Sequence, residues 1–423
     1  MRVESERVRV RGHRLAAATG VFALAALVLS SGGPASADAI RNREYWLAGY
    51  GITEAWNTTR GEGVTIAIID TGVDATHPDL AGAVVAGEDF TGNGRGGKPV
   101  AGQSHGTSVA SLAAGRGHGS DDGVIGVAPA ASILSASVAF GDGIDSDTQV
   151  ADAINWAIDN GADVINMSFT RETLDWPESW DAAFLRAEKA GVVMVAAAGN
   201  RGSGTAVVGA PATIPGVLTV AGVDAAGTSS TKASSQGITI GVAAPSERLV
   251  AAVPGGGYTS FTGTSGAAPI VAGLVALVKA AHPELSAGAI INRIVRTARP
   301  AGADGVDALY GYGLFDAAAA VSDAPVEAVT AAEAANGNPL GELTEWIRMN
   351  RRAAPPMESA VPVERVEPVE TPASADPIAA LLPSTAQLRD IGLPALVLGA
   401  GGLVLLTLVA TALRHAFGRR QKG

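Results

Sequence analysis

The chain has 423 residues, a formal net charge of −11 at pH 7 and no cysteine. This length accommodates one large α/β domain with appendages, or two ordinary domains. The acidic balance argues against a dedicated nucleic-acid-binding protein, and the absence of cysteine excludes disulfides, thiolate zinc sites and cysteine nucleophiles.

Residues 1–37 have the pattern of a secretory signal peptide. Arginines come first, an apolar run follows near residues 15–30, and the small residues "ASA" at 35–37 form a cleavage site. We expect cleavage after Ala37, and the alternative is an uncleaved signal anchor. Residues 38–63 then form a short N-terminal extension.

Residues 64–322 alternate apolar runs with helical stretches. Buried strands are predicted at 64–70, 131–140, 162–169, 191–200 and 216–224, and helices at 105–115, 147–160 and 177–190. A long apolar helix is expected over 267–285, and a closing helix over 311–321. This alternation predicts a three-layer α/β domain, with a mostly parallel central sheet and helices on both faces.

Residues 323–391 are rich in Pro, Glu and Val and predict an extended linker. Within them, 338–350 suit either a solvated linker, which we favour, or a short amphipathic helix docked on the domain. Residues 392–413 are apolar and long enough to span a bilayer, the alternative being a buried core helix. The basic tail, 414–423, predicts a cytoplasmic C-terminus and an extracellular body.

Four polar residues stand at the ends of predicted elements. Asp70 ends an apolar strand, His105 begins a helix, Asn200 follows another strand and Ser265 begins the long apolar helix. Each alone suits a structural role: a turn carboxylate, a helix-start histidine, a turn amide and an N-cap serine. Because the carboxyl ends of parallel strands share one edge of a sheet, we expect the four to gather there.

The motifs "DTGV", "HGTSVA", "AAAGN" and "GTSGAAP", in this order, resemble those of the subtilisin-like serine proteases. The resemblance covers about residues 45–322. It implies that Asp70, His105 and Ser265 form a catalytic triad that works through an acyl-enzyme, and that Asn200 binds the oxyanion. It also implies that Ser168, Phe169 and Thr170 line the substrate-binding site.

Some positions depart from the family. Gly266 replaces a larger residue and leaves space, or flexibility, beside Ser265. The bulkier Thr170 and the charged Arg171 suggest a narrow cleft that prefers an acidic substrate residue. No cofactor is expected to be required. A structural calcium near Asp79 and the acidic loop 117–123 is the less favoured alternative to a solvated loop.

The signal peptide, lead-in, Pro-rich linker and anchor together resemble the mycosins, the subtilases of actinobacterial type VII secretion systems. This implies a membrane-anchored extracellular serine endopeptidase that acts on protein or peptide substrates, with secretion substrates among them. A second hypothesis is a structural component of a secretion complex with little or no proteolysis. A third, an esterase or amidase, shares the triad but not these motifs.

Overall fold

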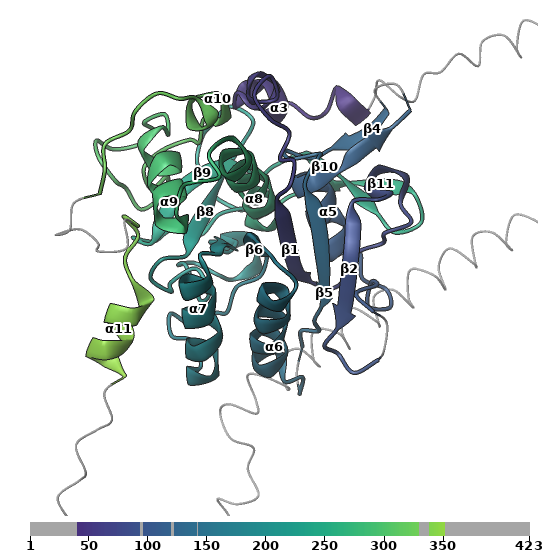
Figure 1. Ribbon diagram of the computed structural model, residues 1–423, viewed down its shortest axis with the longest axis horizontal. Helices are drawn as coiled ribbons and strands as arrows, with labels where there is room; N and C mark the ends of the chain where they lie inside the picture. Colours follow the sequence, from purple (N-terminus) through teal and green to yellow (C-terminus); the bar gives the residue numbers. More distant parts are fainter. Residues whose placement is uncertain (1–39, 94–95, 120–121, 142, 330–337, 352–423) are drawn as a thin grey trace, which may run out of the picture. The chain divides into compact units, whose positions relative to one another are not determined.

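The computed structural model describes residues 40–93, 96–119, 122–141, 143–329 and 338–351. Within this part of the chain, a central sheet is flanked by helices (Figure 1). The predicted segments at 1–37, 392–413 and 414–423 lie outside the described residues, as does the linker from residue 352 onward.

The central sheet has seven strands in the order β2-β5-β1-β6-β7-β8-β9. Every neighbouring pair in it is parallel. The strands are β1 (Thr65–Asp70), β2 (Val84–Asp89), β5 (Ser132–Ser137), β6 (Val164–Met167), β7 (Val193–Ala197), β8 (Leu218–Val223) and β9 (Ile240–Pro245). The predicted strands correspond to β1, β5, β6, β7 and β8 and are confirmed. After β1 the chain forms β2 and β5 on one side of this strand and then crosses to β6 on its other side. The strand order therefore reverses at β1, and ligands bind at such a switch point.

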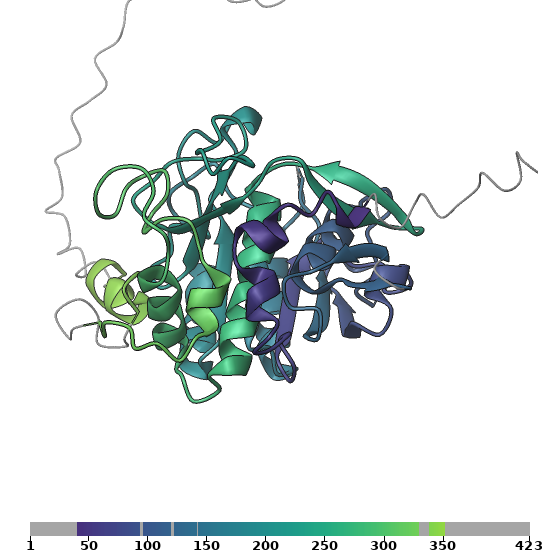
Figure 2. The ribbon, with the colours of Figure 1, turned by 90° about the horizontal axis from the view of Figure 1, so that it is seen from above.

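Helices cover both faces of this sheet. On one face, α5 (His105–Ala114) packs against α8 (Thr264–Ala281). On the other, α6 (Ser146–Asp159) packs against α7 (Glu178–Ala190), as Figure 1 shows. Figure 2 gives the same ribbon from a second direction. The helices α9 (Ala287–Arg296) and α10 (Ala317–Val321) end the peptidase region. The predicted layers and the helices near 105, 147, 177 and 267 are therefore confirmed.

Two small antiparallel hairpins lie outside the main sheet. One pairs β3 (Arg116–His118) with β4 (Asp122–Ile125), and the other pairs β10 (Leu249–Val253) with β11 (Gly257–Phe261). The second hairpin leads directly into α8, so it sets the approach of the chain to Ser265.

Among the described residues, α8 is the one helix whose length and composition suit a membrane crossing. Its side chains from Ala267 to Val278 are nevertheless buried inside the domain. This burial identifies α8 as the central core helix. Its Pro269 lies inside the helix and beyond the first turn, so its missing N–H removes the helical hydrogen bond to the carbonyl oxygen of Ser265. That oxygen instead accepts the hydroxyl of Ser168 at 3.0 Å.

The N-terminal extension belongs to the folded domain, which corrects the boundary predicted at residue 64. Its helices α3 (Trp46–Gly49) and α4 (Ile52–Ala55) insert Trp46 and Ile52 completely into the core. The indole of Trp56 donates to the carbonyl oxygen of Val127 at 2.8 Å. Large apolar side chains that spread along 46–56 therefore anchor this segment.

The domain also extends beyond residue 322 on the C-terminal side. The helix α11 (Leu343–Asn350) packs on α7, with Leu343 buried and the ring centroid of Trp346 only 4.4 Å from that of Trp176. Arg351 Nε lies 3.0 Å from a carboxylate oxygen of Asp181. The favoured solvated linker is therefore wrong for residues 338–351, because their amphipathic face meets a complementary aromatic surface.

Candidate active site

The structure brings the four predicted polar residues to elements that meet at one edge of the sheet. Asp70 is the last residue of β1, and His105 is the first residue of α5. Asn200 follows β7, and Ser265 is the second residue of α8. This convergence follows from the switch point at β1, because α5 and α8 both pack beside that strand.

Asp70 and His105 form a close pair. The ring atom Nδ1 of His105 lies 2.9 Å from both carboxylate oxygens of Asp70. Because a carboxylate only accepts hydrogen bonds, Nδ1 carries the proton and Nε2 is left as the basic atom. A Cβ on Gly106 would lie 2.5 Å from the carbonyl oxygen of Gly72, so glycine allows α5 to begin this close to β1.

The surroundings of His105 act on its pKa in opposite directions. Burial lowers the pKa, but the charge of Asp70 and its hydrogen bond raise it, and the net shift is upward from the ordinary histidine value. Asp70 itself is only 2% exposed, and it also accepts the backbone N–H of Thr71 at 2.7 Å. The carboxylate is thus fixed in place before any substrate binds.

Ser265 is held by a reciprocal pair of hydrogen bonds with Ser168. The hydroxyl of Ser265 donates to the carbonyl oxygen of Ser168 at 3.0 Å, and the hydroxyl of Ser168 donates to the carbonyl oxygen of Ser265 at 3.0 Å. The amide of Asn166 donates to Ser168 Oγ at 2.9 Å. In this arrangement the Ser265 hydroxyl is directed to Ser168 and not to His105.

Asn200 is oriented by the start of α8. Its Oδ1 accepts the backbone N–H of Thr264 at 2.8 Å and the Thr264 hydroxyl at 3.1 Å. Because a backbone N–H can only donate, its bond identifies the side-chain oxygen, so Nδ2 is the end that can donate elsewhere. A Cβ on Gly263, where φ is +139°, would lie 3.1 Å from that Nδ2, which explains why glycine stands there.

The expected space beside Ser265 is filled. A Cβ on Gly266 would lie 2.5 Å from Leu249 Cδ1 and 3.0 Å from Phe261 Cδ1. The Phe261 ring centroid lies 5.4 Å from that of His105. Glycine at 266 therefore admits Phe261, which packs on the imidazole. The sequence motifs did not indicate Phe261, because it belongs to the hairpin that precedes α8.

The three residues predicted to bind substrate have different surroundings. Ser168 is buried beside Ser265, as described above. The Phe169 ring contacts the Phe140 ring, and the Thr170 hydroxyl donates to the carbonyl oxygen of Arg171 at 3.1 Å. The Arg171 guanidinium pairs with Asp147, so this contact gives no support to the expected preference for acidic substrates.

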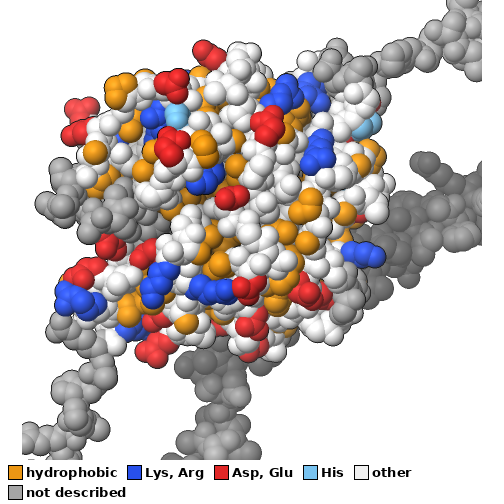
Figure 3. All heavy atoms as spheres, viewed as in Figure 1, with side chains coloured by type: hydrophobic (Ala, Val, Ile, Leu, Met, Phe, Trp, Pro, Cys, Tyr) orange, Lys and Arg blue, Asp and Glu red, His pale blue; other side chains and the backbone are white. Residues whose placement is uncertain are grey.

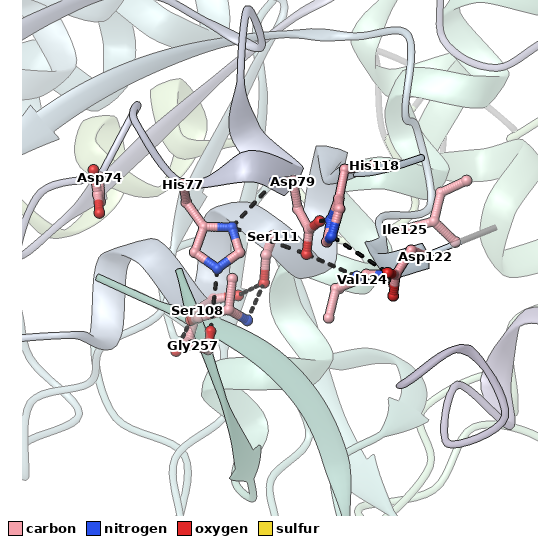
Figure 4. A network of polar contacts seen from close by, with 12 residues as sticks. Asp74, His77, Asp79, Ser108, Ser111, His118, Asp122, Val124, Ile125 and Gly257 are labelled. Atoms are coloured by element: carbon pink, nitrogen blue, oxygen red, sulfur yellow. Dashed lines mark hydrogen bonds and ion pairs between the residues drawn. The ribbon is translucent and has the colours of Figure 1, made fainter. Parts of the chain in front are cut away.

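Asp79 lies in a separate network of polar contacts (Figure 4). Its Oδ1 lies 2.5 Å from His118 Nδ1, and its Oδ2 accepts the backbone N–H of Val124 at 2.8 Å. Within the described ranges, no group of three or more His, Cys, Asp or Glu side chains is arranged to hold a metal ion. The Asp79 carboxylate is therefore occupied by protein donors in this arrangement.

An open cavity of about 560 Å³ lies next to His105. Its wall is formed by residues 99–104, which lead into α5, and by Val253, Pro254, Tyr258 and Thr259 of the β10–β11 hairpin. The lining carries no ionisable group besides the Tyr258 phenol. This cavity reaches Ser104, the residue before His105, but is not lined by Ser265 or Asn200. A carboxylate-oriented imidazole, a serine hydroxyl and an amide donor at one edge of the sheet have the chemistry of acyl transfer.

Comparisons with known proteins agree with this chemistry. Residues 61–313 match the family model described as the subtilase family. Subtilisin DY of Bacillus licheniformis is 37% identical over 271 residues, covering 62% of this chain and 92% of that protein. Thermitase of Thermoactinomyces vulgaris is 38% identical over 237 residues, covering 56% of this chain and 82% of that protein. A solved structure of MycP1 without its N-terminal propeptide has 32% identity and a TM-score of 0.59, covering 66% of this chain and 97% of that one.

Proposed function

Because this chain belongs to the subtilase family of serine endopeptidases, we propose that it cuts peptide bonds through the triad of Asp70, His105 and Ser265. The single observation that carries this assignment is the contact of His105 Nδ1 with both oxygens of Asp70. That contact leaves Nε2 as a base on the side of the ring away from the carboxylate.

In the proposed reaction, substrate binding moves the Ser265 hydroxyl from Ser168 to His105 Nε2. The serine oxygen attacks the scissile carbonyl carbon while Nε2 takes the hydroxyl proton. Asp70 keeps the Nδ1 proton in place and stabilises the imidazolium. The protonated ring then gives its proton to the leaving amine, and water hydrolyses the acyl-enzyme by the same steps.

Two donors would stabilise the negative oxygen of the tetrahedral intermediate. One is Asn200 Nδ2, whose orientation is fixed by the bonds from Thr264 to Oδ1. The other is the backbone N–H of Ser265, which lies in the first turn of α8, where N–H groups have no partner within the helix. Donors fixed before the reaction cost no reorganisation when the charge develops.

We also propose that the enzyme is an anchored extracellular protein that processes substrates of a type VII secretion system. Support for the anchor is the sequence pattern at 1–37 and 392–413. Support for the secretion role is the resemblance to the mycosins in the signal peptide, lead-in, Pro-rich linker and anchor. The 32% identity to the MycP1 structure agrees with that resemblance. On the face drawn in Figure 3, acidic and basic side chains are interspersed, a surface unlike that of a nucleic-acid-binding protein.

The alternative role as a structural component rests on one observation, the bond of the Ser265 hydroxyl to Ser168. The deciding experiment uses full-length protein in isolated membranes, as wild type and as Ser265→Ala, with casein as an unstructured substrate. We expect new casein N-termini with the wild type alone. Intact casein with both proteins would favour the structural role. Equal cleavage by both would reject Ser265 as the nucleophile.

The secretion role needs a test in the host. The N-termini of secreted proteins are mapped in cells that carry the wild type or Ser265→Ala as their sole copy. Processed termini of secretion substrates that disappear in the variant support the role. An unchanged set of termini would restrict the proposal to a protease with other substrates.

A further inference from the structure

The carbonyl group of Ser265 is hydrogen-bonded from outside its own helix. In a regular α-helix this oxygen accepts the backbone N–H of the residue four positions later, which here is Pro269. Proline has no N–H, and its ring crowds the carbonyl group four residues before it. The Ser265 oxygen accepts the hydroxyl of Ser168 at 3.0 Å. A side chain next to β6 therefore supplies the hydrogen bond that Pro269 removes at the proposed nucleophile.

The amide of Asn166 fixes the direction of this hydrogen bond. A carbonyl oxygen only accepts, so the one hydroxyl proton of Ser168 points to Ser265. The other contact of Ser168 Oγ, at 2.9 Å from Asn166 Nδ2, is then one in which the amide donates. Both side chains are buried, Ser168 at 2% exposure and Asn166 at 0%. The donors therefore run in one direction, from β6 through Ser168 to the first turn of α8.

The first turn of α8 is also held from the neighbouring strand. The backbone N–H of Gly199, which follows β7, donates to Thr264 Oγ1 at 3.0 Å. Thr264 thus holds the chain before Ser265, where the backbone N–H is the second proposed oxyanion donor. Ser168 holds the chain after Ser265, at its carbonyl group. The two contacts fix the backbone on both sides of the nucleophile, and only the second takes the place of a missing helical bond.

We propose that the Ser168 side chain is a positioning group, which fixes the backbone of Ser265 in place of the helical hydrogen bond that Pro269 removes. This inference rests on the proposed role of Ser265. The contact does not use the Ser265 hydroxyl proton, so it persists while that hydroxyl turns to His105. Asn166 acts through Ser168 by keeping its hydroxyl directed at the carbonyl group. Because a displacement of about 1 Å costs on the order of 10²-fold in rate, loss of this one contact should be measurable in kcat.

The test is a double-mutant cycle in the full-length protein, with wild type, Ser168→Ala, Pro269→Ala and the variant that carries both changes. Pro269→Ala restores an N–H that can donate to the Ser265 carbonyl oxygen, so the Ser168 hydroxyl is no longer its required donor. Ser135→Ala is the matched control, because Ser135 in β5 is 1% exposed and its hydroxyl donates to the carbonyl oxygen of Gly97 at 2.7 Å. The measured quantities are kcat and KM for one peptide amide, the rate of Ser265 labelling by a fluorophosphonate, and the denaturant midpoint.

We expect Ser168→Ala to lower kcat and the labelling rate about tenfold and to change KM less than about twofold. In the Pro269→Ala background the same change should lower kcat by less than about threefold. Ser135→Ala should lower the denaturant midpoint and keep kcat. An equal loss of kcat in both backgrounds, a change confined to KM, or no change at all would overturn the inference.

A second cycle uses Asn166→Ala, which keeps the Ser168 hydroxyl but removes the group that directs it. This cycle decides the question if Ser168→Ala does not fold. Asn166→Ala should lower kcat about threefold to tenfold, and by less in the Pro269→Ala background. Equal losses in the two backgrounds would again overturn the inference. A labelled wild type with either negative result leaves the proposed triad standing, whereas a wild type that neither cuts the peptide nor accepts the label would refute both.

Discussion

The carboxylates of Asp70 and Asp79 each hold the Nδ1 atom of a histidine ring, that of His105 in one case and that of His118 in the other. Both carboxylates are buried, and the two rings have similar exposure, 35% for the side chain of His105 and 39% for that of His118. Burial and the Nδ1 contact therefore do not separate a catalytic pair from a structural one.

The second nitrogen of each ring does separate them. His118 Nε2 lies 3.5 Å from a carboxylate oxygen of Asp122, so this ring sits between two acidic groups (Figure 4). His105 has a carboxylate on its Nδ1 side, and the Phe261 ring packs against its own ring. Both nitrogens of the His118 ring face carboxylates, whereas the Nε2 atom of the His105 ring points away from Asp70 and is able to take a proton from a hydroxyl.

The largest change in kcat should come from substitution of the proposed nucleophile. Ser265→Ala should lower kcat on a peptide substrate on the order of 10⁶-fold, a magnitude taken from subtilisin, a relative. Its control is Ser286→Ala, which removes the serine cap at the start of α9, where Ser286 Oγ accepts the N–H of Ala289. That control should lose about 1 kcal/mol of stability and keep kcat. Equal losses of kcat in both variants would assign Ser265 a structural role.

The carboxylate of the proposed catalytic pair should have the second largest effect. Asp70→Asn should lower kcat about 10⁴-fold, a magnitude taken from another serine protease, because an amide holds the wrong tautomer of the imidazole. The circular dichroism spectrum should be unchanged. A variant with kcat within tenfold of the wild type would show that His105 is oriented by other groups.

The proposed oxyanion donor, Asn200, should have a smaller effect on kcat. Asn200→Ala should lower kcat about 10²–10³-fold, again as measured for subtilisin, and change KM little. Because Asn200 Oδ1 also accepts the N–H of Thr264, Asn200→Asp serves as the control that keeps this acceptor but loses the donor. Both variants should be impaired. Full activity in Asn200→Asp would assign the Asn200 side chain to support of α8 alone.

The pH profile tests the raised pKa of His105. The value of kcat/KM should rise with pH as the ring becomes neutral, with a midpoint above the ordinary histidine pKa of about 6.5. The contribution of His105 to the stability of the fold should change with pH in the opposite direction. A pKa raised by folding stabilises the chain below the unfolded pKa, and this contribution is lost as pH rises through the folded pKa. A midpoint below 6.5 would mean that burial outweighs Asp70.

The structural pair should affect stability and not chemistry. His118→Ala removes a partner from the fully buried Asp79, and we expect a loss of about 1–3 kcal/mol in the free energy of unfolding. The kcat/KM value should stay within about twofold of the wild-type value. The midpoint of its pH profile should shift by no more than a few tenths of a pH unit. Denaturant titration and the pH profile measure the two quantities. Loss of activity at full stability would contradict the division between the pairs.

The sequence predicted the layers of the domain because its central strands are continuous apolar runs. It did not predict β2 and β9. The edge strand β2, "VVAGED", is half-exposed and mixed in polarity, and β9, "IGVAAP", contains glycine and proline. The folded domain is longer at both ends than the predicted 64–322, because the docking of Trp46 and Trp346 depends on partners distant in the chain.

The motifs also predicted which residues meet at the site, but not what surrounds them. The topology of the sheet is enough to place four residues together, because each stands at or next to the end of a strand or the start of a helix. They are Asp70, His105, Asn200 and Ser265. Phe261 and Phe140 are part of no motif, and only folding brings them beside His105 and Phe169. Likewise, Gly266 stands where the family has a larger residue. The Phe261 side chain explains this glycine, because it comes from the preceding hairpin and occupies the space beside position 266.

The central claim, that one histidine–aspartate pair activates Ser265 and the other does not, is tested most directly by fluorophosphonate labelling. The full-length wild type, His105→Ala and His118→Ala are treated with the probe, and the modified residue is located by mass spectrometry. The account predicts a label on Ser265 in the wild type and in His118→Ala, and none in His105→Ala. A label that survives in His105→Ala, or that is lost in folded His118→Ala, would contradict it.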